Sequence, residues 1–134
     1  MNISYIWQRL FWLFFSKNYS SHANSDGATL TGGAGAWAAG TYATILAAST
    51  ATNRFKVNYV VVESMSVTEP MQIDIATGGA GSEVIVTSLK VAAAGRYPVN
   101  VIDLDKTTRI SARLASKSGG ADTAVVSVEY SVHY

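Results

Sequence analysis

The sequence predicts an all-β chain that folds as a two-sheet antiparallel β-sandwich, either a plain sandwich or a jelly roll. Three observations predict it: runs of alternating apolar and polar residues, clusters of turn-forming residues between the runs, and no helical periodicity after residue 40. Each alternating strand buries one face, which needs a second sheet or a partner to cover it. About half of the residues (49%) are apolar and 14% are charged, which is typical of a folded domain.

The first nineteen residues form an aromatic segment that differs from the rest of the chain. It holds seven of the fourteen aromatic residues, whereas all fourteen valines follow residue 56. Ile3, Trp7, Leu10, Phe11 and Phe14 follow helical spacing, which predicts a short helix. The apolar run of about 13 residues is shorter than the roughly 20 that cross a bilayer, so we expect no integral membrane span.

Several interpretations of this aromatic segment stay open. It could be a secretion signal, with Ser21-His22-Ala23 as a small-residue cleavage site, although no Lys or Arg precedes the apolar run. It could be a helix that docks on a membrane surface or on a partner protein. The interpretation that we favour is an appended tail, or a start assigned upstream of the true domain.

The next segment, residues 20–40, is rich in Ser, Gly, Ala and Thr. Because it has few large apolar groups to offset the chain entropy lost on folding, its composition predicts a linker. Trp37 is the exception and could anchor the linker to the domain. The predicted organisation is an aromatic segment over 1–19, a linker over 20–40 and a β-sandwich domain over 41–134.

Seven strands are expected in the sandwich domain, at about 41–48, 54–68, 70–77, 83–91, 96–104, 108–116 and 122–134. In the second strand the odd positions from Phe55, including Val57, Tyr59 and Val61, form the predicted apolar face. Pro70 is expected to separate the second strand from the third, because proline cannot donate to a ladder. The last strand alternates most clearly, with one face made of Ala124, Val126, Val128, Tyr130, Val132 and Tyr134.

Composition narrows the range of functions. Ten Lys and Arg against nine Asp and Glu give a net charge of +1, so no nucleic-acid partner is expected. The chain has no cysteine and two histidines, which excludes disulfides and thiolate chemistry and argues against a multi-histidine metal site. No paired nucleophile and base stands out, so we expect neither an enzyme nor a cofactor.

Four acidic residues could carry chemistry, and each has a simpler interpretation. Asp103 and Asp105 could bind calcium, but a D-x-D without further ligands predicts a turn capped by Asp. Asp74 and Glu83 could form a carboxylate pair across the segment ATGGAGSE at 76–83. That segment lacks the G-K-[ST] ending of a phosphate loop, and it predicts a flexible hairpin whose glycines supply positive φ.

Other candidates are basic or aromatic. Arg109 and Arg113 share a strand face and could meet acidic groups or phosphates, or be solvated. His133 is expected to be a surface or hydrogen-bonded residue. Trp37 and Tyr42 could form a stacking platform for a carbohydrate, because aromatic rings offer flat apolar faces, but a core or interface role is the simpler expectation.

Five segments of residues 41–134 form a distinctive series: TYATILAAST, FKVNYVVVESMSV, IDIATGGAGSEVIV, TTRISARLAS and GGADTAVVSVEY. As a series they resemble small β-sandwich structural proteins of tailed bacteriophages. In such proteins a D-I-A-x-G-x-A-G-S-E-like strand end precedes a hydrophobic strand, and a T-R-I-x-A-R segment follows later. The shorter polar loop after Val91, AAAGRYPVN, departs from that pattern.

The resemblance implies a virion structural protein without catalytic residues, for capsid decoration, cementing or fibre-like attachment. It implies capsid or tail proteins as partners and a homo-oligomer, with a trimer expected. The alternative is a surface or tail-associated module that recognises glycans through Trp37, Tyr42 and Tyr97. Since aromatic side chains anchor interfaces, the expected interface residues are Trp7, Phe11, Trp12, Trp37, Tyr42, Tyr97, Tyr130 and Tyr134.

Overall fold

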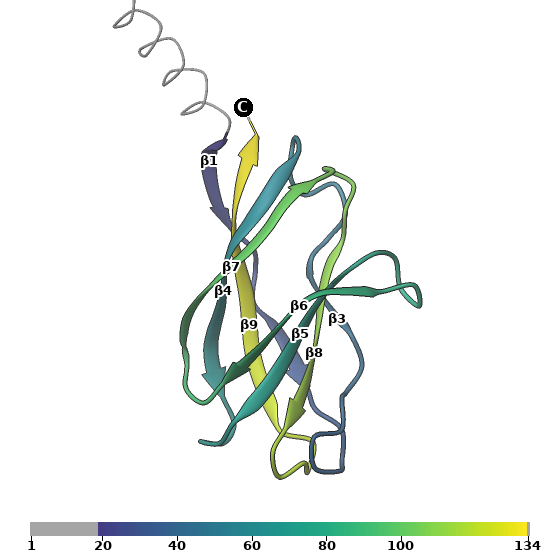
Figure 1. Cartoon of the computed structure of the whole chain (residues 1–134), viewed down its shortest axis with the longest axis vertical. Coiled ribbons are helices and arrows are strands. Elements are labelled where there is room, and N and C mark those ends of the chain that lie inside the picture. Colours follow the sequence, from purple (N-terminus) through teal and green to yellow (C-terminus); the bar gives the residue numbers. More distant parts are fainter. Residues whose placement is uncertain (1–18, 134) are drawn as a thin grey trace, which may run out of the picture.

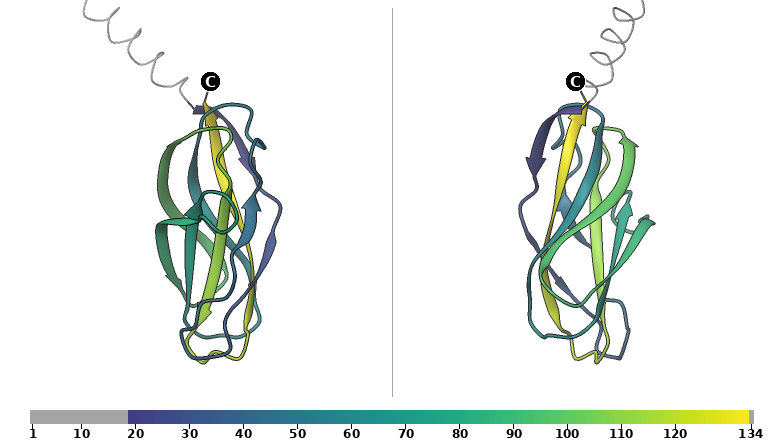
Figure 2. Two further views of the ribbon diagram at one scale, coloured as in Figure 1. Left: turned by 90° about the vertical axis from the view of Figure 1, so that its right-hand side faces the viewer. Right: turned by 60° about the vertical axis from the view of Figure 1, so that its left-hand side comes forward.

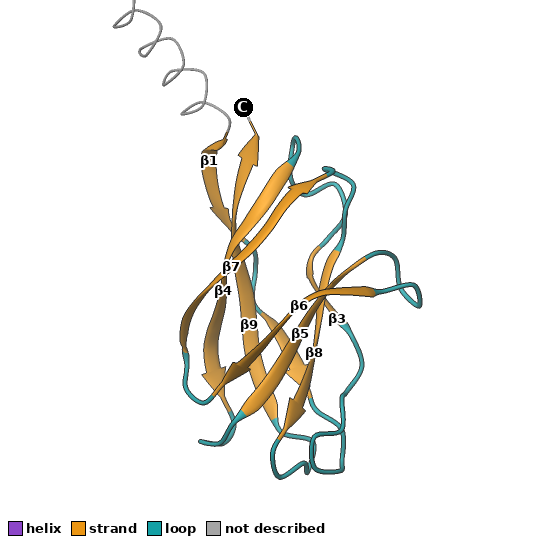
Figure 3. Cartoon of the chain, viewed as in Figure 1, coloured by secondary structure: helices purple, strands orange, loops and turns teal. Residues whose placement is uncertain are grey.

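The computed structural model describes residues 19–133, which form nine strands and no helix. The strands are β1 (Tyr19–Asn24), β2 (Ala28–Thr31), β3 (Ala43–Leu46), β4 (Phe55–Met65), β5 (Met71–Thr77), β6 (Val84–Val91), β7 (Gly95–Leu104), β8 (Ile110–Ser116) and β9 (Thr123–His133). All seven strands expected after residue 40 are present, so the predicted all-β class is confirmed (Figure 3). The predicted N-terminal helix and the interface candidates Trp7, Phe11, Trp12 and Tyr134 lie outside the described residues.

The strands form two antiparallel sheets that pack face to face (Figures 1 and 2). The five-stranded sheet has the order β1-β9-β4-β7, with β2 also paired to β9, and the four-stranded sheet has the order β3-β8-β5-β6. β1 pairs with the second half of β9 and β2 with the first half, so together they act as one interrupted strand. Counted that way, eight strands are divided between the two sheets in the strand order of a jelly roll, which is one of the two predicted architectures.

The core lies between the two sheets. The alternation expected for β9 is confirmed, because Ala124, Val126 and Val128 are buried. Phe55 and Tyr130 meet edge to face, with ring centroids 5.8 Å apart. The largest fully buried side chains are Phe55, Leu30, Met71, Ile73, Ile75, Ile110, Leu114, Val57, Val60, Val62, Val126 and Val128.

The alternation expected for β4 is wrong beyond Val57. The register of β4 against both β7 and β9 shifts between Val57 and Tyr59. Because of this bulge, Val57 and Val60 are both buried in the core, while Asn58 and Tyr59 between them both line the outer face. A strict period of two places Tyr59 and Val61 in the core, and no residue type in the segment marks the extra residue.

The linker expected over 20–40 contains two strands instead. β1 and β2 both pair with β9, and Leu30 of β2 is fully buried. Composition counts only side chains, so it misses the backbone hydrogen bonds that β9 supplies to these polar residues. The sandwich therefore starts upstream of Thr41.

The Gly- and Ala-rich loop after β2 is tightly packed. A Cβ atom on Gly40 would lie 1.7 Å from the carbonyl oxygen of Thr31, so only glycine fits. Trp37 donates its backbone N–H to the carbonyl oxygen of Ser116 at 2.7 Å and ties the loop to the end of β8. This contact is made by the backbone of Trp37, whose ring stays 44% exposed, and the glycines serve close packing.

Candidate functional site

A hollow of about 580 Å³ lies on the outer face of the five-stranded sheet, and we call it the polar hollow. It is lined by His22, Ala23, Asn24, Asn58, Tyr59, Arg96, Pro98, Val99 and Glu129. These residues come from β1, β4, β7 and β9, so every strand along the order β1-β9-β4-β7 contributes. The volume falls within the range of about 300–1,000 Å³ that is typical of ligand sites.

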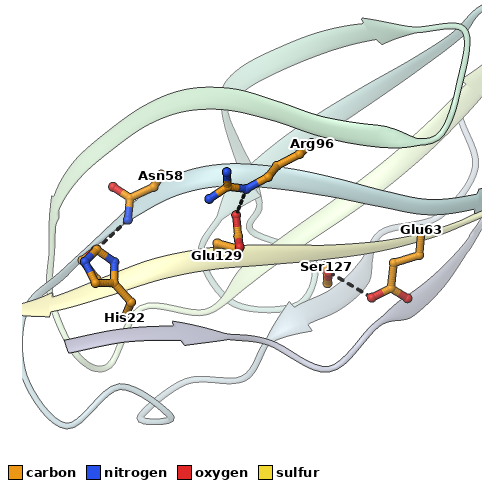
Figure 4. Close-up of polar contacts among 7 residues, drawn as sticks. His22, Asn58, Glu63, Arg96, Ser127 and Glu129 are labelled. Atoms are coloured by element: carbon orange, nitrogen blue, oxygen red, sulfur yellow. Dashed lines mark hydrogen bonds and ion pairs between the residues drawn. The ribbon is translucent and has the colours of Figure 1, made fainter.

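A chain of hydrogen bonds crosses one end of the polar hollow. Asn58 Nδ2 donates to Ser131 Oγ at 2.6 Å, and Ser131 Oγ lies 2.9 Å from His22 Nδ1. Figure 4 shows the Asn58 amide and the His22 ring next to each other. Because Asn58 is the donor to Ser131, the Ser131 hydroxyl is able to donate to the imidazole. Ser131 is fully buried, so these bonds satisfy its hydroxyl and hold the side chains of β1 and β4 in place.

An ion pair crosses the middle of the polar hollow. Arg96 Nε of β7 donates to Glu129 Oε2 of β9 (Figure 4). The Arg96 guanidinium also lies over the Tyr59 ring, 3.7 Å from its centroid. The bond to Glu129 raises the pKa of Arg96. The opposite charges of this ion pair largely cancel each other.

A smaller contact lies on the same face of β9, outside the hollow. Ser127 Oγ donates to Glu63 Oε1 of β4 at 3.2 Å (Figure 4). Ser127 is buried, so this bond satisfies a second outward-facing serine of β9. The outer face of β9 is therefore held by polar contacts along much of its length.

A second hollow, of about 350 Å³, lies on the outer face of the four-stranded sheet, and we call it the Trp37 hollow. It is lined by Trp37, Ala39, Gln72, Asp74, Lys90, Arg113 and Ala115. Asp74 accepts hydrogen bonds from Gln72 Nε2 at 3.0 Å, Ser88 Oγ at 2.7 Å and Arg113 Nε at 2.8 Å. Burial raises the pKa of Asp74, but these three bonds together outweigh it and hold the pKa below its ordinary value.

The stacking surface that the glycan alternative requires of Trp37, Tyr42 and Tyr97 is not assembled on one face. Trp37 is 44% exposed, and Lys90 Nζ lies 5.4 Å from its ring centroid. The Arg113 guanidinium lies 5.0 Å from the Tyr42 ring centroid, so a cation covers part of each ring. Tyr97 belongs to β7 of the other sheet, where its hydroxyl donates to a backbone carbonyl at 2.6 Å.

The expectation for Tyr130 as an interface residue is corrected by its position. Tyr130 is 6% exposed and packs against Phe55 in the core. Its place in the alternating run of β9 is the signal for this burial, because it falls on the same face as Val126 and Val128. Its ring is therefore not available to a partner.

The carboxylate pair expected from Asp74 and Glu83 is not formed, because each pairs with its own arginine. Arg113 Nε lies 2.8 Å from Asp74 Oδ2, and Arg109 Nη1 lies 3.2 Å from Glu83 Oε1. Arg109 and Arg113 are four residues apart along an extended chain, or about 13 Å. The interpretation in which these arginines meet acidic groups is confirmed.

Two expected turns are confirmed. Asp105 Oδ1 accepts bonds from the backbone N–H and the hydroxyl of Thr107, each at 2.9 Å, so Asp105 caps a turn. In the β5–β6 hairpin, Gly78 and Gly81 have φ angles of 112° and 84°, which only glycine adopts freely.

Within residues 19–133 no cluster of three or more His, Asp or Glu side chains is placed to hold a metal ion. The same residues contain no helix long and apolar enough to cross a membrane.

The residues of the polar hollow are the ones that sequence reasoning missed. His22 and Asn24 fell in the expected linker, and Tyr59 was assigned to the core. Arg96 and Glu129 lie on strands whose order the sequence does not determine. No signal in the sequence pointed to their meeting.

No protein-family model matches this chain, and no curated protein matches it. Among solved structures, a chain of the disulfide-linked pili that form Bacillus endospore appendages is similar, at 16% identity over 87% of this chain and 93% of that one, with a TM-score of 0.42. The CBM36-1 domain of a xylanase from the hindgut metagenome of Trinervitermes trinervoides is similar at 8% identity over 83% and 96%, with a TM-score of 0.47. VP2 of infectious bursal disease virus is similar at 16% identity over 84% and 32%, with a TM-score of 0.41. Likenesses this remote carry no information about what this chain binds.

Proposed function

We propose that this chain is a non-enzymatic structural protein of a phage virion, either a capsid decoration or cement protein or a fibre-like attachment component. Its partners are other capsid or tail proteins and further copies of itself, and its location is the virion. The five segments that resemble phage β-sandwich proteins contribute β3, β4, the β5–β6 hairpin, β8 and β9, so they include strands of both sheets. The fold alone does not define a function, so the surface must carry it.

The observation that carries the proposal is the apolar edge formed by β6. β6 is the last strand in the order β3-β8-β5-β6, so its outer side has no neighbour among the described strands. Val84, Ile85 and Val86 follow one another there with exposed fractions of 65%, 43% and 41%. Figure 1 shows the β5–β6 hairpin extending from the sandwich. An exposed apolar edge strand without proline is a template for pairing with another chain, which supports a role in assembly.

Mass spectrometry of purified virus particles tests this function. We expect peptides of the chain in particles from a culture that expresses it, and their loss from particles when Val84→Lys and Val86→Lys are combined. Ile102→Lys on β7 is the matched control, because Ile102 is also an exposed apolar residue, 53% exposed, but belongs to the other sheet. Absence of the unmodified chain from assembled particles contradicts the proposal.

A second candidate function is recognition of glycans by a surface or tail-associated module. The observation that favours it is the polar hollow, which presents amide, imidazole and carboxylate groups beside apolar walls. The hollow and the β6 edge lie on different sheets, so the two functions are tested separately.

A further inference from the structure

We infer that the polar hollow binds an uncharged oligosaccharide, with Asn58, Asn24 and His22 as the residues that recognise its hydroxyl groups. This inference rests on the second candidate function, and it places the site on the sheet opposite to Trp37 and Tyr42. Both hollows carry polar groups, but only the polar hollow combines them with fixed geometry, balanced charge and an apolar wall.

The fixed geometry comes from the bonds beneath the hollow. Asn58 uses one N–H toward Ser131, so its Oδ1 and its second N–H are left for a ligand. His22 uses Nδ1 toward the same hydroxyl, which leaves Nε2 on the opposite edge of the ring. The two side chains are therefore oriented before any ligand arrives, which lowers the entropy lost on binding.

The charge balance favours an uncharged ligand. Of the lining residues, Arg96 is the one Arg or Lys and Glu129 is the one Asp or Glu. Their side chains form an ion pair. An anionic ligand would meet the Glu129 carboxylate next to Arg96, and a cationic ligand would meet the guanidinium. Hydroxyl groups both donate and accept, so they match the mixture of amide, carboxylate and guanidinium groups.

The walls of the hollow suit the shape of a sugar ring, which has apolar C–H faces and polar edges. Pro98 of β7 is exposed and supplies an apolar surface along one side, whereas Val99 packs against the core. The Arg96 guanidinium lies over the Tyr59 ring and covers it, which excludes Tyr59 as an open stacking surface. We therefore assign the apolar contact to Pro98 and the hydrogen bonds to the residues of β1 and β4.

The Trp37 hollow is the competing location. There Asp74 already receives three hydrogen bonds within the protein, and Arg113 is shared between Asp74 and the Tyr42 ring. Lys90 lies beside the Trp37 ring, and Asp74 is the one acidic residue among those that line this hollow. That hollow has an excess of positive charge and fewer polar groups left for hydroxyls.

A glycan array that carries neutral oligosaccharides and their sialylated counterparts tests the inference on the full chain. We expect binding to neutral members, no gain from sialic acid, and a loss of about tenfold in affinity for His22→Ala and for Asn24→Ala. Both side chains are exposed. His22→Ala also removes a hydrogen bond to the buried hydroxyl of Ser131, so Asn24→Ala is the variant that tests binding alone. Thr29→Ala, an exposed position of β2 on the same sheet, is the control that should bind as the unmodified chain does.

Two results overturn the inference in different ways. If Trp37→Ala abolishes binding while His22→Ala and Asn24→Ala do not, the chain recognises glycans but at the Trp37 hollow. If the array shows no binding to any neutral glycan, the inference and the second candidate function both fail, and the proposed role in virion assembly is unaffected.

Discussion

Asn58 and Tyr59 are consecutive residues of β4, yet both side chains lie on the outer face of the five-stranded sheet. Asn58 reaches across to Ser131 of β9, whereas Tyr59 lies beneath the guanidinium of Arg96 from β7. One residue therefore contacts the strand on one side of β4 and the other contacts the strand on the opposite side. The bulge that allows this arrangement also creates the polar hollow, which depends on both contacts.

Substitution of Asn58 by Ala should lower the free energy of unfolding by about 1 kcal/mol. The change removes one of the two hydrogen-bond partners of Ser131, whose hydroxyl is fully buried. Urea unfolding at neutral pH measures the effect, with Asn24→Ala as the control at an exposed position of the same hollow. Equal midpoints for the two variants would show that the Asn58–Ser131 bond contributes nothing.

Substitution of Leu30 by Ala should cost about 2–5 kcal/mol, the range for removing a large aliphatic side chain from a core. Leu30 is fully buried, although it lies in a segment whose composition predicts a linker. Thr29→Ala, at the exposed neighbouring position, should change stability by no more than about 0.5 kcal/mol. A loss for Leu30→Ala as small as that of the control would mean that β2 does not belong to the core.

Substitution of Gly40 by Ala should strongly destabilise the fold, by about 3 kcal/mol or more. The added Cβ atom would lie 1.7 Å from the carbonyl oxygen of Thr31, and a backbone atom of a paired strand cannot move aside cheaply. Gly79→Ala is the matched control, since nothing lies within 4 Å of a Cβ atom at Gly79. Thermal unfolding compares the two variants, and similar transition temperatures would contradict the close packing of the loop.

The stability of the chain should fall in acid, and Asp74 should account for part of the fall. Its pKa in the folded state lies below the ordinary value of about 3.9, so the unfolded chain binds a proton more readily. The resulting stabilisation is present above the unfolded pKa and is lost as the pH falls through the folded pKa. Asp74→Asn should therefore lose less stability than the unmodified chain between about pH 5 and pH 3. Identical losses in urea unfolding at the two pH values would contradict this role for Asp74.

The strands after residue 40 could be predicted because their signals are local. Alternation, turn-forming clusters and Pro70 are all properties of adjacent residues, and they locate β3 to β9. β1 and β2 could not be predicted, since their polar residues are held by backbone pairing with β9, about a hundred positions away in the chain.

The candidate site could not be predicted for a related reason. It depends on the order β1-β9-β4-β7, which alternation does not determine, and on a bulge that leaves no mark in residue type. The contact of Trp37 with β8 could not be predicted either, because it is made by the backbone N–H and not by the aromatic ring. Turns and alternating runs could be predicted from adjacent residues, whereas contacts between strands that are distant in the chain could not.

The measurement that tests assembly through the β6 edge most directly is multi-angle light scattering of the full chain across micromolar concentrations. The proposal predicts a particle mass that is a multiple of the chain mass of 14.2 kDa, with three chains expected. It also predicts that the chain carrying both Val84→Lys and Val86→Lys falls to a single chain mass, while Ile102→Lys leaves the mass unchanged. A mass of one chain for the unmodified protein over the whole concentration range would contradict the proposed assembly.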